Sequence, residues 1–488
     1  MHEEKGENMH IKITFHESIF SQLQSSLRWD DGKEKATYLL CNTSTHQGRI
    51  KLLPDKVIIP KKDDYIKRSP GYYSLAKPFI NRVVNEAIET DSHLIQCHVH
   101  PGNPGIFSGV DAVKEPQLMR HIADKVDGIF HASLVFGNSL NTLDGWFYDR
   151  EKDKLIPIEK VLVVGREKMD IFIPWGSPLK NKKLHPSLSR SVMAFGEEAM
   201  EILGMLDIGV VGASALGGPI VEFCSRDKVR SLFLCDLDSI DETNLNRLSG
   251  TIPSDIGKNK AIFYAEKAKQ ISSQTIVVPF PKTFYDFEVQ EAFSQADVIF
   301  GCVDSGARHS INQLALANNV PYFDLGATIQ SENGNLKFVG GQVYSIIPGR
   351  GACLSCSGSF DHLLSEYIPP DDREMKVKRG YIKDDDSITI PLVAYLDYII
   401  AGLGYREFLK YILGLSENEV FKTQYNEMQN KIVQSRCSDD GCLSCQSDGF
   451  LGKGDKVPIM VPREKADLRI ANIPTETEAY FPEMDICV

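Results

Sequence analysis

The chain has 488 residues, of which 42% are hydrophobic and 25% are charged, as in soluble globular proteins and unlike disordered or collagen-like chains. Its 54 lysines and arginines against 66 aspartates and glutamates give a net charge of −12, so we expect no general attraction to nucleic acid or to anionic lipid. No apolar run approaches the ~20 residues of a membrane span, and the N-terminus lacks the apolar core of a secretory signal. We therefore predict a cytoplasmic protein of about three domains, without nucleic-acid or membrane partners.

The first part of the chain, residues 1–155, is predicted to be a small mixed α/β domain. Short apolar runs such as KATYLL, HLIQCHVH and HASLVFG alternate with turn signals, and one helical stretch lies at about 75–90. Lysine and proline are frequent in the segment that follows, 156–190, which we interpret as a connector.

The sharpest pattern in this domain is HVHP, six further residues and SGVD, which contains His98, His100, Ser108 and Asp111. The two histidines alternate at the end of an apolar strand, so both imidazoles project from the same face. With Asp111 as a third ligand, they would leave an open position for water on a tetrahedral zinc, as in a hydrolytic site. Ser108 is placed to hydrogen-bond an oxyanion at the metal. A surface loop with incidental histidines is the alternative, which the complete spacing disfavours.

These residues resemble the signature of the JAMM (JAB/MPN) metalloprotease family, His-x-His, seven residues, Ser-x-x-Asp, and the match is complete. The resemblance implies an upstream glutamate that acts as general base through the zinc-bound water. By position, Glu34, just before the first strand, is the best candidate. Glu86 and Glu89 are alternatives, but they are expected to be solvated on the helix before the metal strand.

From 191 to 452, strand and helix candidates alternate as in a doubly wound parallel sheet. This pattern predicts a Rossmann-like fold of the α/β class. Buried-strand candidates, such as LDIGVVG, SLFLCD, TIVVPF and PYFDLG, alternate with amphipathic stretches. A charged loop is expected at 360–390, followed by a long buried helix at 391–414 that is interrupted at its glycines. The remaining residues, 453–488, are interpreted as a C-terminal tail.

The glycine-rich segment VVGASALGGPI follows an apolar strand and opens a helix. Gly212, Ser214 and Gly217 occupy the three positions of the G-x-G-x-x-G turn that holds phosphates in dinucleotide-binding folds. The next strand ends at Asp236, where a carboxylate meets ribose hydroxyls in the Rossmann arrangement. By themselves, these residues would suggest a dehydrogenase.

The residues that follow favour a nucleoside triphosphate over NAD. Asn244 and Arg247 lie just beyond the strand, and Lys258 is expected at the start of a helix. A cationic pair at this position suits a triphosphate, and Asp304, at the end of a later strand, can hold its magnesium. A structural salt-bridge network is the alternative for any one of these residues, but the set favours the nucleotide.

In their order along the chain, these elements resemble the ThiF/MoeB/HesA branch of the ubiquitin-activating enzyme superfamily. The shared pattern is a Gly-rich turn, D-x-D-x-V/I-x-x-x-N-L-x-R, G-K-x-K, a late aspartate and paired Cys-x-x-Cys. The resemblance implies adenylation with ATP, in which Asp236 binds ribose and Asp304 holds magnesium. Asn244, Arg247 and Lys258 would then bind the phosphates.

The same resemblance implies an arginine before the first strand that reaches the phosphates of a partner subunit. Arg190 matches that position, so we expect a homodimer. Arg247 and Lys258 would also act in catalysis by stabilising the negative charge on the triphosphate as pyrophosphate leaves. The sequence departs from the family pattern where Ser214 replaces the second glycine and where Leu248 stands in place of a frequent glutamine.

Four of the 11 cysteines form two Cys-x-x-Cys pairs, which in a reducing compartment indicate a tetrahedral zinc site and not disulfides. By the family resemblance this zinc is structural and clamps the distal segment to the fold. The paired residues are Cys353, Cys356, Cys442 and Cys445. The cysteines expected to be small buried side chains are Cys41, Cys97, Cys224, Cys235 and Cys302.

No cysteine lies between Cys356 and Cys437, so the loop that usually carries the thioester-forming cysteine of this family contains none. We therefore predict that the adenylate passes directly to an external nucleophile. Cys437 is the nearest remaining candidate, but its closeness to Cys442 and Cys445 favours a structural or incidental role.

Together the two resemblances imply a fusion like those of bacterial ubiquitin-like conjugation systems. We expect the C-terminal domain to adenylate the terminal carboxylate of a ubiquitin-like protein, and the zinc domain to hydrolyse bonds after that C-terminus. A ubiquitin-conjugating-type enzyme is a further candidate partner. The alternative is an adenylyltransferase for a sulfur-carrier protein or a peptide in cofactor or natural-product synthesis. A catalytically silent scaffold is disfavoured because both constellations retain their ionisable residues.

Overall fold

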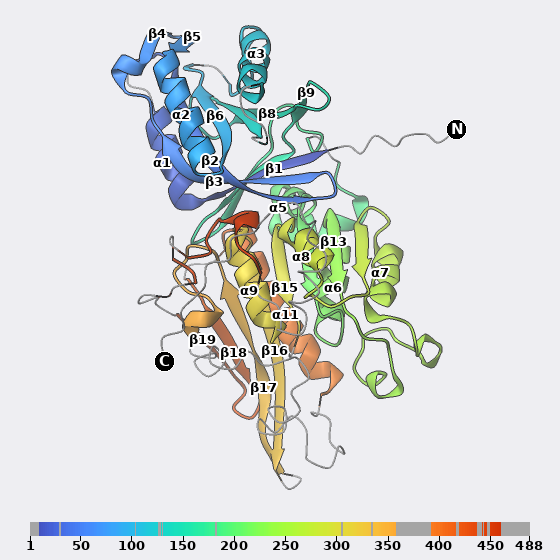
Figure 1. The fold of residues 1–488 in the computed structure, drawn as a ribbon. Coiled ribbons are helices and arrows are strands. Elements are labelled where there is room, and N and C mark those ends of the chain that lie inside the picture. The colour runs from blue at the N-terminus through green and yellow to red at the C-terminus, as the bar shows by residue number, and fades with distance from the viewer. Residues whose placement is uncertain are drawn as a thin grey trace, which may run out of the picture.

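The structure is a computed structural model of the chain. It describes residues 9–28, 31–102, 104–124, 128, 130–180, 183–303, 306–332, 335–357, 392–415, 419–436, 442, 444–446 and 449–459. Four predictions lie wholly or mostly outside these residues: the magnesium ligand Asp304, the candidate thiol Cys437, the charged loop 360–390 and the C-terminal tail from residue 460 onward. Figure 1 shows an N-terminal unit, coloured blue to teal, that lies against a C-terminal unit coloured green to red.

The N-terminal unit is built on a nine-stranded mixed sheet with the order β11-β10-β1-β3-β2-β6-β7-β8-β9. Its strands are β1 (His10–His16), β2 (Lys35–His46), β3 (Arg49–Ile58), β6 (His93–Val99), β7 (His131–Phe136), β8 (Leu143–Asp149), β9 (Lys154–Pro157), β10 (Lys160–Val164) and β11 (Met169–Phe172). A separate hairpin pairs β4 (Tyr65–Ser69) with β5 (Tyr72–Leu75). The helices of this unit are α1 (Glu17–Leu27), α2 (Lys77–Glu89) and α3 (Asp111–Ala123).

Strand alternation separates the two buried faces of this sheet. Along β6, Ile95 and Cys97 belong to the cluster that packs against α1, whereas Leu94 belongs to the cluster that packs against α2. Successive side chains of a strand point to opposite faces, so His98 lies on the same face as Leu94. The predicted metal ligand is therefore on the side of the sheet that α2 covers.

The segment predicted as a connector, 156–190, contains two strands of the N-terminal sheet. β10 pairs in parallel with β1, and β11 pairs antiparallel with β10. The sheet therefore extends beyond the predicted boundary at residue 155. β10 was not predicted because it begins at Lys160, and lysines usually lie on the surface. In the structure, Lys160 is fully buried against carboxylates of the other unit.

The C-terminal unit is built on an eight-stranded sheet with the order β14-β13-β12-β15-β16-β17-β18-β19. The strands from β14 to β16 are parallel and the last three pairings are antiparallel, so the sheet is only partly of the predicted parallel type. The strands are β12 (Asp207–Val211), β13 (Ser231–Cys235), β14 (Ile276–Phe280), β15 (Val298–Gly301), β16 (Tyr322–Glu332), β17 (Asn335–Ile346), β18 (Lys422–Asn426) and β19 (Lys431–Ser435). The helices are α4 (Ser189–Phe195), α5 (Glu197–Leu203), α6 (Gly217–Arg226), α7 (Lys260–Ile271), α8 (Phe287–Ser294), α9 (Ala307–Ala317) and α11 (Ala394–Ile412).

Helices cover both faces of this sheet. The larger cluster contains side chains of α6, α7 and α11, and the second cluster contains those of α8 and α9. The predicted helix at 391–414 is present as α11, but it is continuous through Gly402 and Gly404 and not interrupted there. A Cβ at Gly404 would lie 2.7 Å from the Leu325 side chain, so this glycine allows α11 to approach β16 closely. In the described part of the chain, none of the helices combines the length and the apolar character required to cross a bilayer.

The two units are joined by contacts that bury charged side chains. Lys12 of β1 and Lys160 of β10 both contact Asp297, which directly precedes β15. The first residues of the predicted tail also join the units, since the 3-10 turn Gly454–Lys456 packs against β2. Asp455 accepts a hydrogen bond from the backbone N–H of Thr45 at 3.0 Å.

Candidate functional sites

The histidine site lies where β6 ends and α3 begins. His98 is the penultimate residue of β6, His100 follows the strand, and Asp111 is the first residue of α3. Both histidines are buried, and their Nε2 atoms are 3.1 Å apart. Asp111 lies 3.6 Å from Nε2 of His98 through Oδ1 and 3.2 Å from Nε2 of His100 through Oδ2.

These separations fit a single tetrahedral ion. Ligand atoms about 2.0–2.1 Å from zinc in a tetrahedron lie about 3.3–3.4 Å from one another. The donor set of two imidazoles and one carboxylate suits zinc and leaves a fourth position for water. The structure thus brings together the three ligands that the sequence predicts, although they come from two elements and an intervening loop.

Glu34 is the glutamate that the structure places beside these ligands. It is 5% exposed, and its Oε1 lies 3.7 Å from Nε2 of His100. Burial raises the pKa of Glu34, and the charges of His98 and His100 oppose that rise. The alternatives do not reach the site, because Glu89 is exposed on α2 and Glu86 binds Lys56 at 2.6 Å.

Ser108 and Asp111 form two hydrogen bonds with each other at the start of α3. The backbone N–H of Ser108 donates to Asp111 Oδ2 at 2.7 Å, and the N–H of Asp111 donates to Ser108 Oγ at 3.3 Å. Burial acts to raise the pKa of Asp111, but hydrogen bonds from His100 and His98 lower it far below its usual value. An ionised carboxylate is also the form in which Asp111 would bind a metal. The Ser108 side chain is exposed and adjacent to the site, so its role as an oxyanion donor stays a prediction.

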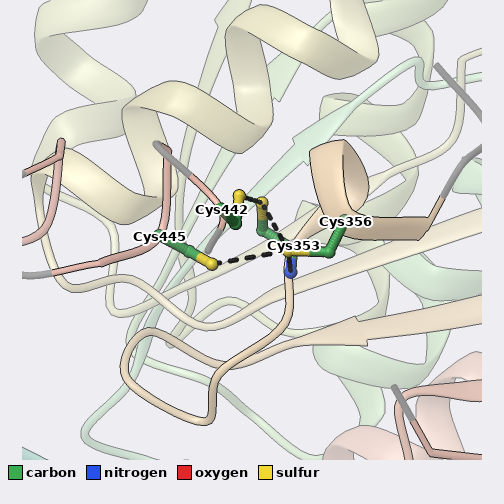
Figure 2. Close-up of side chains that lie close together, drawn as sticks. All are labelled: Cys353, Cys356, Cys442 and Cys445. Atoms are coloured by element: carbon green, nitrogen blue, oxygen red, sulfur yellow. Dashed lines mark hydrogen bonds between the residues drawn. The ribbon is translucent and has the colours of Figure 1, made fainter. Parts of the chain in front are cut away.

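The four paired cysteines converge at a second site, and Figure 2 shows their sulfur atoms gathered together. Cys353 Sγ lies 3.8 Å from the Sγ atoms of both Cys356 and Cys442, and Cys356 Sγ lies 3.5 Å from that of Cys445. Sulfurs bound tetrahedrally at about 2.3 Å from zinc lie about 3.8 Å apart. Hydrogen bonds from Cys356 and Cys445 lower the pKa of the Cys353 thiol, and the same contacts raise the pKa of the Cys356 and Cys445 thiols. Zinc binding would require all four thiols to lose their protons.

At three positions of the glycine-rich turn after β12 there is no space for a side chain. Gly212 has φ +89°, and a Cβ there would lie 2.7 Å from the carbonyl oxygen of Cys302. A Cβ on Gly217 would lie 2.0 Å from the Gly212 oxygen, and one on Gly218 would lie 2.5 Å from the ring of Tyr264. Gly218 was missed by the G-x-G-x-x-G reading, although the Gly-Gly pair in the sequence was the available signal. The turn opens directly into α6, whose N-terminus is suited to phosphate.

Asp236 and Asn244 occupy the loop beyond β13. Asp236 directly follows the strand, and its Oδ1 accepts from the Asp238 N–H at 3.0 Å. Asn244 is 2% exposed, and its Oδ1 has no hydrogen-bond partner among the residues that the structure describes. A buried, unsatisfied amide oxygen at this edge is consistent with a polar ligand. Arg247 is half-buried nearby, where its Nη1 donates to the Thr243 carbonyl at 2.6 Å.

Lys260, and not Lys258, is the buried lysine of this region. Helix α7 begins at Lys260, two residues later than predicted, because the side chain of Asn259 caps it. Lys260 is 6% exposed, and its Nζ lies 3.0 Å from Asp238, two residues beyond the ribose candidate. Lys258 is half exposed and binds Asp255 at 2.9 Å. The motif G-K-N-K contains both lysines, so position alone could not separate them.

Asp397 on α11 is a second residue that the sequence patterns did not single out. It is 1% exposed, and its Oδ2 has no partner in the described part of the chain. Burial raises its pKa to about 7, and the charge of Arg247 opposes that rise. A carboxylate near the proposed phosphate-binding arginine, within an apolar helix, carries no sequence signal of its own.

Arg190, the predicted arginine for a partner's phosphates, lies on α4. It is exposed, and no side chain of this short helix is buried. Met193 is 87% exposed and Phe195 is 46% exposed on the same helix. The role of Arg190 at a partner's nucleotide stays a prediction.

Comparison with known proteins gives a match over the C-terminal unit. The model of the ThiF family matches residues 188–444. "Ubiquitin-like modifier-activating enzyme 5" of Drosophila mojavensis is 25% identical over 260 residues, which are 49% of this chain and 60% of that protein. The Dictyostelium discoideum protein of the same name is 26% identical over 259 residues, 49% of this chain and 62% of that protein. The chain thus spans about 60% of the length of these relatives.

Solved structures are also similar in part. The E. coli MccB structure with ATP has a TM-score of 0.44 and 17% sequence identity, and the alignment covers 54% of this chain and 75% of that chain.

Proposed function

Because the chain belongs to the ThiF family, we propose that its C-terminal unit adenylates the terminal carboxylate of a ubiquitin-like protein. The observation that carries the proposal is that β12 and β13 are neighbouring parallel strands, so that the glycine turn and the loop with Asn244 and Arg247 follow them at the same sheet edge. Lys260 begins α7 directly after that loop and contacts Asp238 within it. Ligands of open α/β sheets bind beyond the carboxyl ends of the strands, so this edge is the place for a nucleotide. The relatives named as ubiquitin-like modifier-activating enzymes support the choice of a ubiquitin-like protein.

In the proposed reaction, a carboxylate oxygen of the carrier attacks the α-phosphorus of ATP, and the bond to the departing pyrophosphate breaks. The products are an acyl-adenylate and pyrophosphate. Arg247 and Lys260 would stabilise the charge that develops on the phosphates, and the turn at Gly217 would allow the backbone to approach them. Asp236 would bind the ribose. Magnesium, for which Asp304 is the proposed ligand, would neutralise phosphate charge.

We further propose that two copies form a homodimer through α4. The exposed Met193 and Phe195 would then become buried, and Arg190 would be carried toward the partner's nucleotide. Large apolar side chains exposed together on one short helix support an interface.

The N-terminal unit is proposed to be a zinc peptidase that cleaves after the same C-terminus. Zinc held by His98, His100 and Asp111 would supply a Lewis acid that lowers the pKa of bound water. Glu34 would accept a proton from the attacking water and deliver it to the leaving amine. Ser108 would donate a hydrogen bond to the developing oxyanion. We place the paired activities in the cytoplasm, in a bacterial ubiquitin-like modification system, with a ubiquitin-conjugating-type enzyme as the proposed acceptor.

Incubation of the full-length protein with ATP and a carrier that ends in a C-terminal extension tests the peptidase half. We expect release of the extension by the wild-type protein and none by Asp111→Asn. Equal cleavage by both proteins, or none by the wild type with any ubiquitin-like carrier, would exclude the proposed peptidase. A peptide that supports ATP–pyrophosphate exchange where ubiquitin-like proteins do not would identify a peptide adenylyltransferase instead.

A further inference from the structure

We propose that Glu115 is the outer carboxylate of the histidine metal site, which accepts the Nδ1–H of His98 and so orients its imidazole. The inference rests on the proposed zinc site and assigns to it a residue outside the sequence signature. Glu115 is a positioning residue, because it would act on the metal only through His98.

Helix α3 presents carboxylates to both nitrogens of the His98 ring. Asp111 and Glu115 are four residues apart and therefore lie on the same face of the helix. Asp111 Oδ1 is 3.6 Å from Nε2 of His98, and Glu115 Oε1 is 3.8 Å from Nδ1 of the same ring. One turn of α3 thus places Asp111 beside Nε2, the nitrogen that would bind the metal, and Glu115 beside Nδ1.

The Nδ1 atom of His98 requires an acceptor when Nε2 binds a metal. A ring that coordinates through Nε2 carries its proton on Nδ1. His98 is fully buried, and its Nδ1 has no hydrogen-bond partner among the described residues. An approach of about 0.9 Å by the ring would give a hydrogen bond of ordinary length to Glu115. A metal bound at Nε2 would fix the position of the ring and favour the shorter distance between Nδ1 and Glu115.

The Glu115 carboxylate is fixed in place by buried neighbours. Its Oε1 accepts from Gln96 Nε2 at 2.9 Å, and its Oε2 accepts from Ser133 Oγ at 2.9 Å. Gln96 is in turn held by Tyr38, whose hydroxyl donates to Gln96 Oε1 at 2.8 Å, and by the Tyr73 hydroxyl at 2.5 Å. The acceptor is thus preorganised before metal binds.

The contacts of Glu115 to Gln96 and Ser133 do not by themselves explain a carboxyl group at this position. Its side chain is 5% exposed, and no lysine or arginine forms an ion pair with it in the described part of the chain. A buried carboxylate without a cation is costly, whereas a glutamine could make the same contacts to Gln96 and Ser133. The charge is useful if it polarises a metal-bound imidazole, since such outer carboxylates fix the tautomer and raise ligand basicity.

The test is zinc affinity at the histidine site of the full-length protein, measured by competition with a chromophoric chelator. Glu115→Gln keeps the size of the side chain and should weaken binding ~10–100-fold, the usual effect of losing an outer partner. Thermal unfolding of the metal-free protein should stay close to wild type. Glu86→Gln, the same change on the surface of α2, should leave zinc affinity unchanged, and zinc at the cysteine cluster serves as an internal control.

Two further measurements separate positioning from folding. With zinc kept at the cysteine cluster and cobalt(II) at the histidine site, the d–d spectrum should shift in Glu115→Gln. Ser133→Ala, which removes one donor to the carboxylate, should weaken zinc binding to a smaller extent. Wild-type affinity and spectrum in Glu115→Gln would overturn the inference while the zinc site stands. Failure of the wild-type protein to bind zinc at the histidines would overturn the proposed peptidase and the inference together.

Discussion

Lys12 Nζ lies 2.6 Å from Asp297 Oδ1, and this contact joins the nine-stranded sheet to the eight-stranded sheet. Both side chains are almost completely buried, and Asp297 also binds Lys160. Burial lowers the pKa of Lys12 to about 8, although the charge of Asp297 opposes the shift. The two units are therefore joined by paired charges in a place where an unpaired charge would be costly.

Removal of Asp297 should destabilise the protein strongly, because it leaves Lys12 and Lys160 buried near a single remaining carboxylate, that of Asp207. Asp297→Ala is expected to lower the free energy of unfolding by about 3–5 kcal/mol, as for other broken buried pairs. Urea unfolding of the full-length protein at pH 7 measures the effect. Glu86→Ala breaks the exposed pair with Lys56 and should change stability by less than about 0.5 kcal/mol. Equal midpoints for the two variants would contradict the structural importance of the interface charges.

His131 should make the protein acid-labile. It is fully buried with no partner at either ring nitrogen among the described residues, and burial lowers its pKa from 6.5 to about 4. Between these values the unfolded chain binds more protons than the folded chain, so stability that is present above pH 6.5 is lost as the pH falls. At pH 5 the loss is about 2 kcal/mol.

His131→Leu removes this titration without the loss of a hydrogen bond. The difference in unfolding free energy between pH 7 and pH 5 should therefore be about 2 kcal/mol smaller in the variant than in the wild type. The same pH dependence in both proteins would show that His131 is not the buried neutral group described.

Two zinc sites in separate units predict a stoichiometry of about two zinc ions per chain. Elemental analysis after dialysis should give about one ion for Asp111→Ala, which loses the hydrolytic site, and about one for Cys442→Ser, which loses the structural site. Loss of both ions in Asp111→Ala, or retention of both, would contradict the assignment of independent sites.

Lys260 and Lys258 provide a matched pair for the nucleotide site. Lys260→Ala should reduce ATP–pyrophosphate exchange ~10²–10³-fold, because it removes a preorganised cation from the phosphates. Lys258→Ala removes only a partly exposed contact to Asp255 and should keep most of the rate. A larger loss of rate in Lys258→Ala than in Lys260→Ala would instead assign the phosphate contact to Lys258.

Spacing within the sequence was sufficient where a local pattern determines the geometry. The alternation of His98 and His100 on one strand, and the short span to Asp111, predict the ligand set directly. Sequence position also singled out Glu34, which lies beside these ligands in the structure. Glu115 could not be predicted, because its role depends on which ring nitrogen faces α3.

The fold was predictable in class and less so at its boundaries. Apolar runs located β12 to β16, and ThiF family membership confirms the Rossmann-like unit. β10 was missed because Lys160 looks like a surface residue until Asp207 and Asp297 are placed beside it. The start of α7 was misplaced because the capping role of Asn259 is visible only in the folded turn.

The most direct test is ATP–pyrophosphate exchange by the full-length protein in the presence of a ubiquitin-like carrier. We expect carrier-dependent exchange in the wild type and in Asp111→Ala, because the metal site and the nucleotide site lie in different units. Arg247→Ala should lose ~10²–10³-fold in rate and still cleave the carrier extension. Exchange near the wild-type rate in Arg247→Ala, or no exchange by the wild type with any ubiquitin-like carrier, would contradict adenylation at this site.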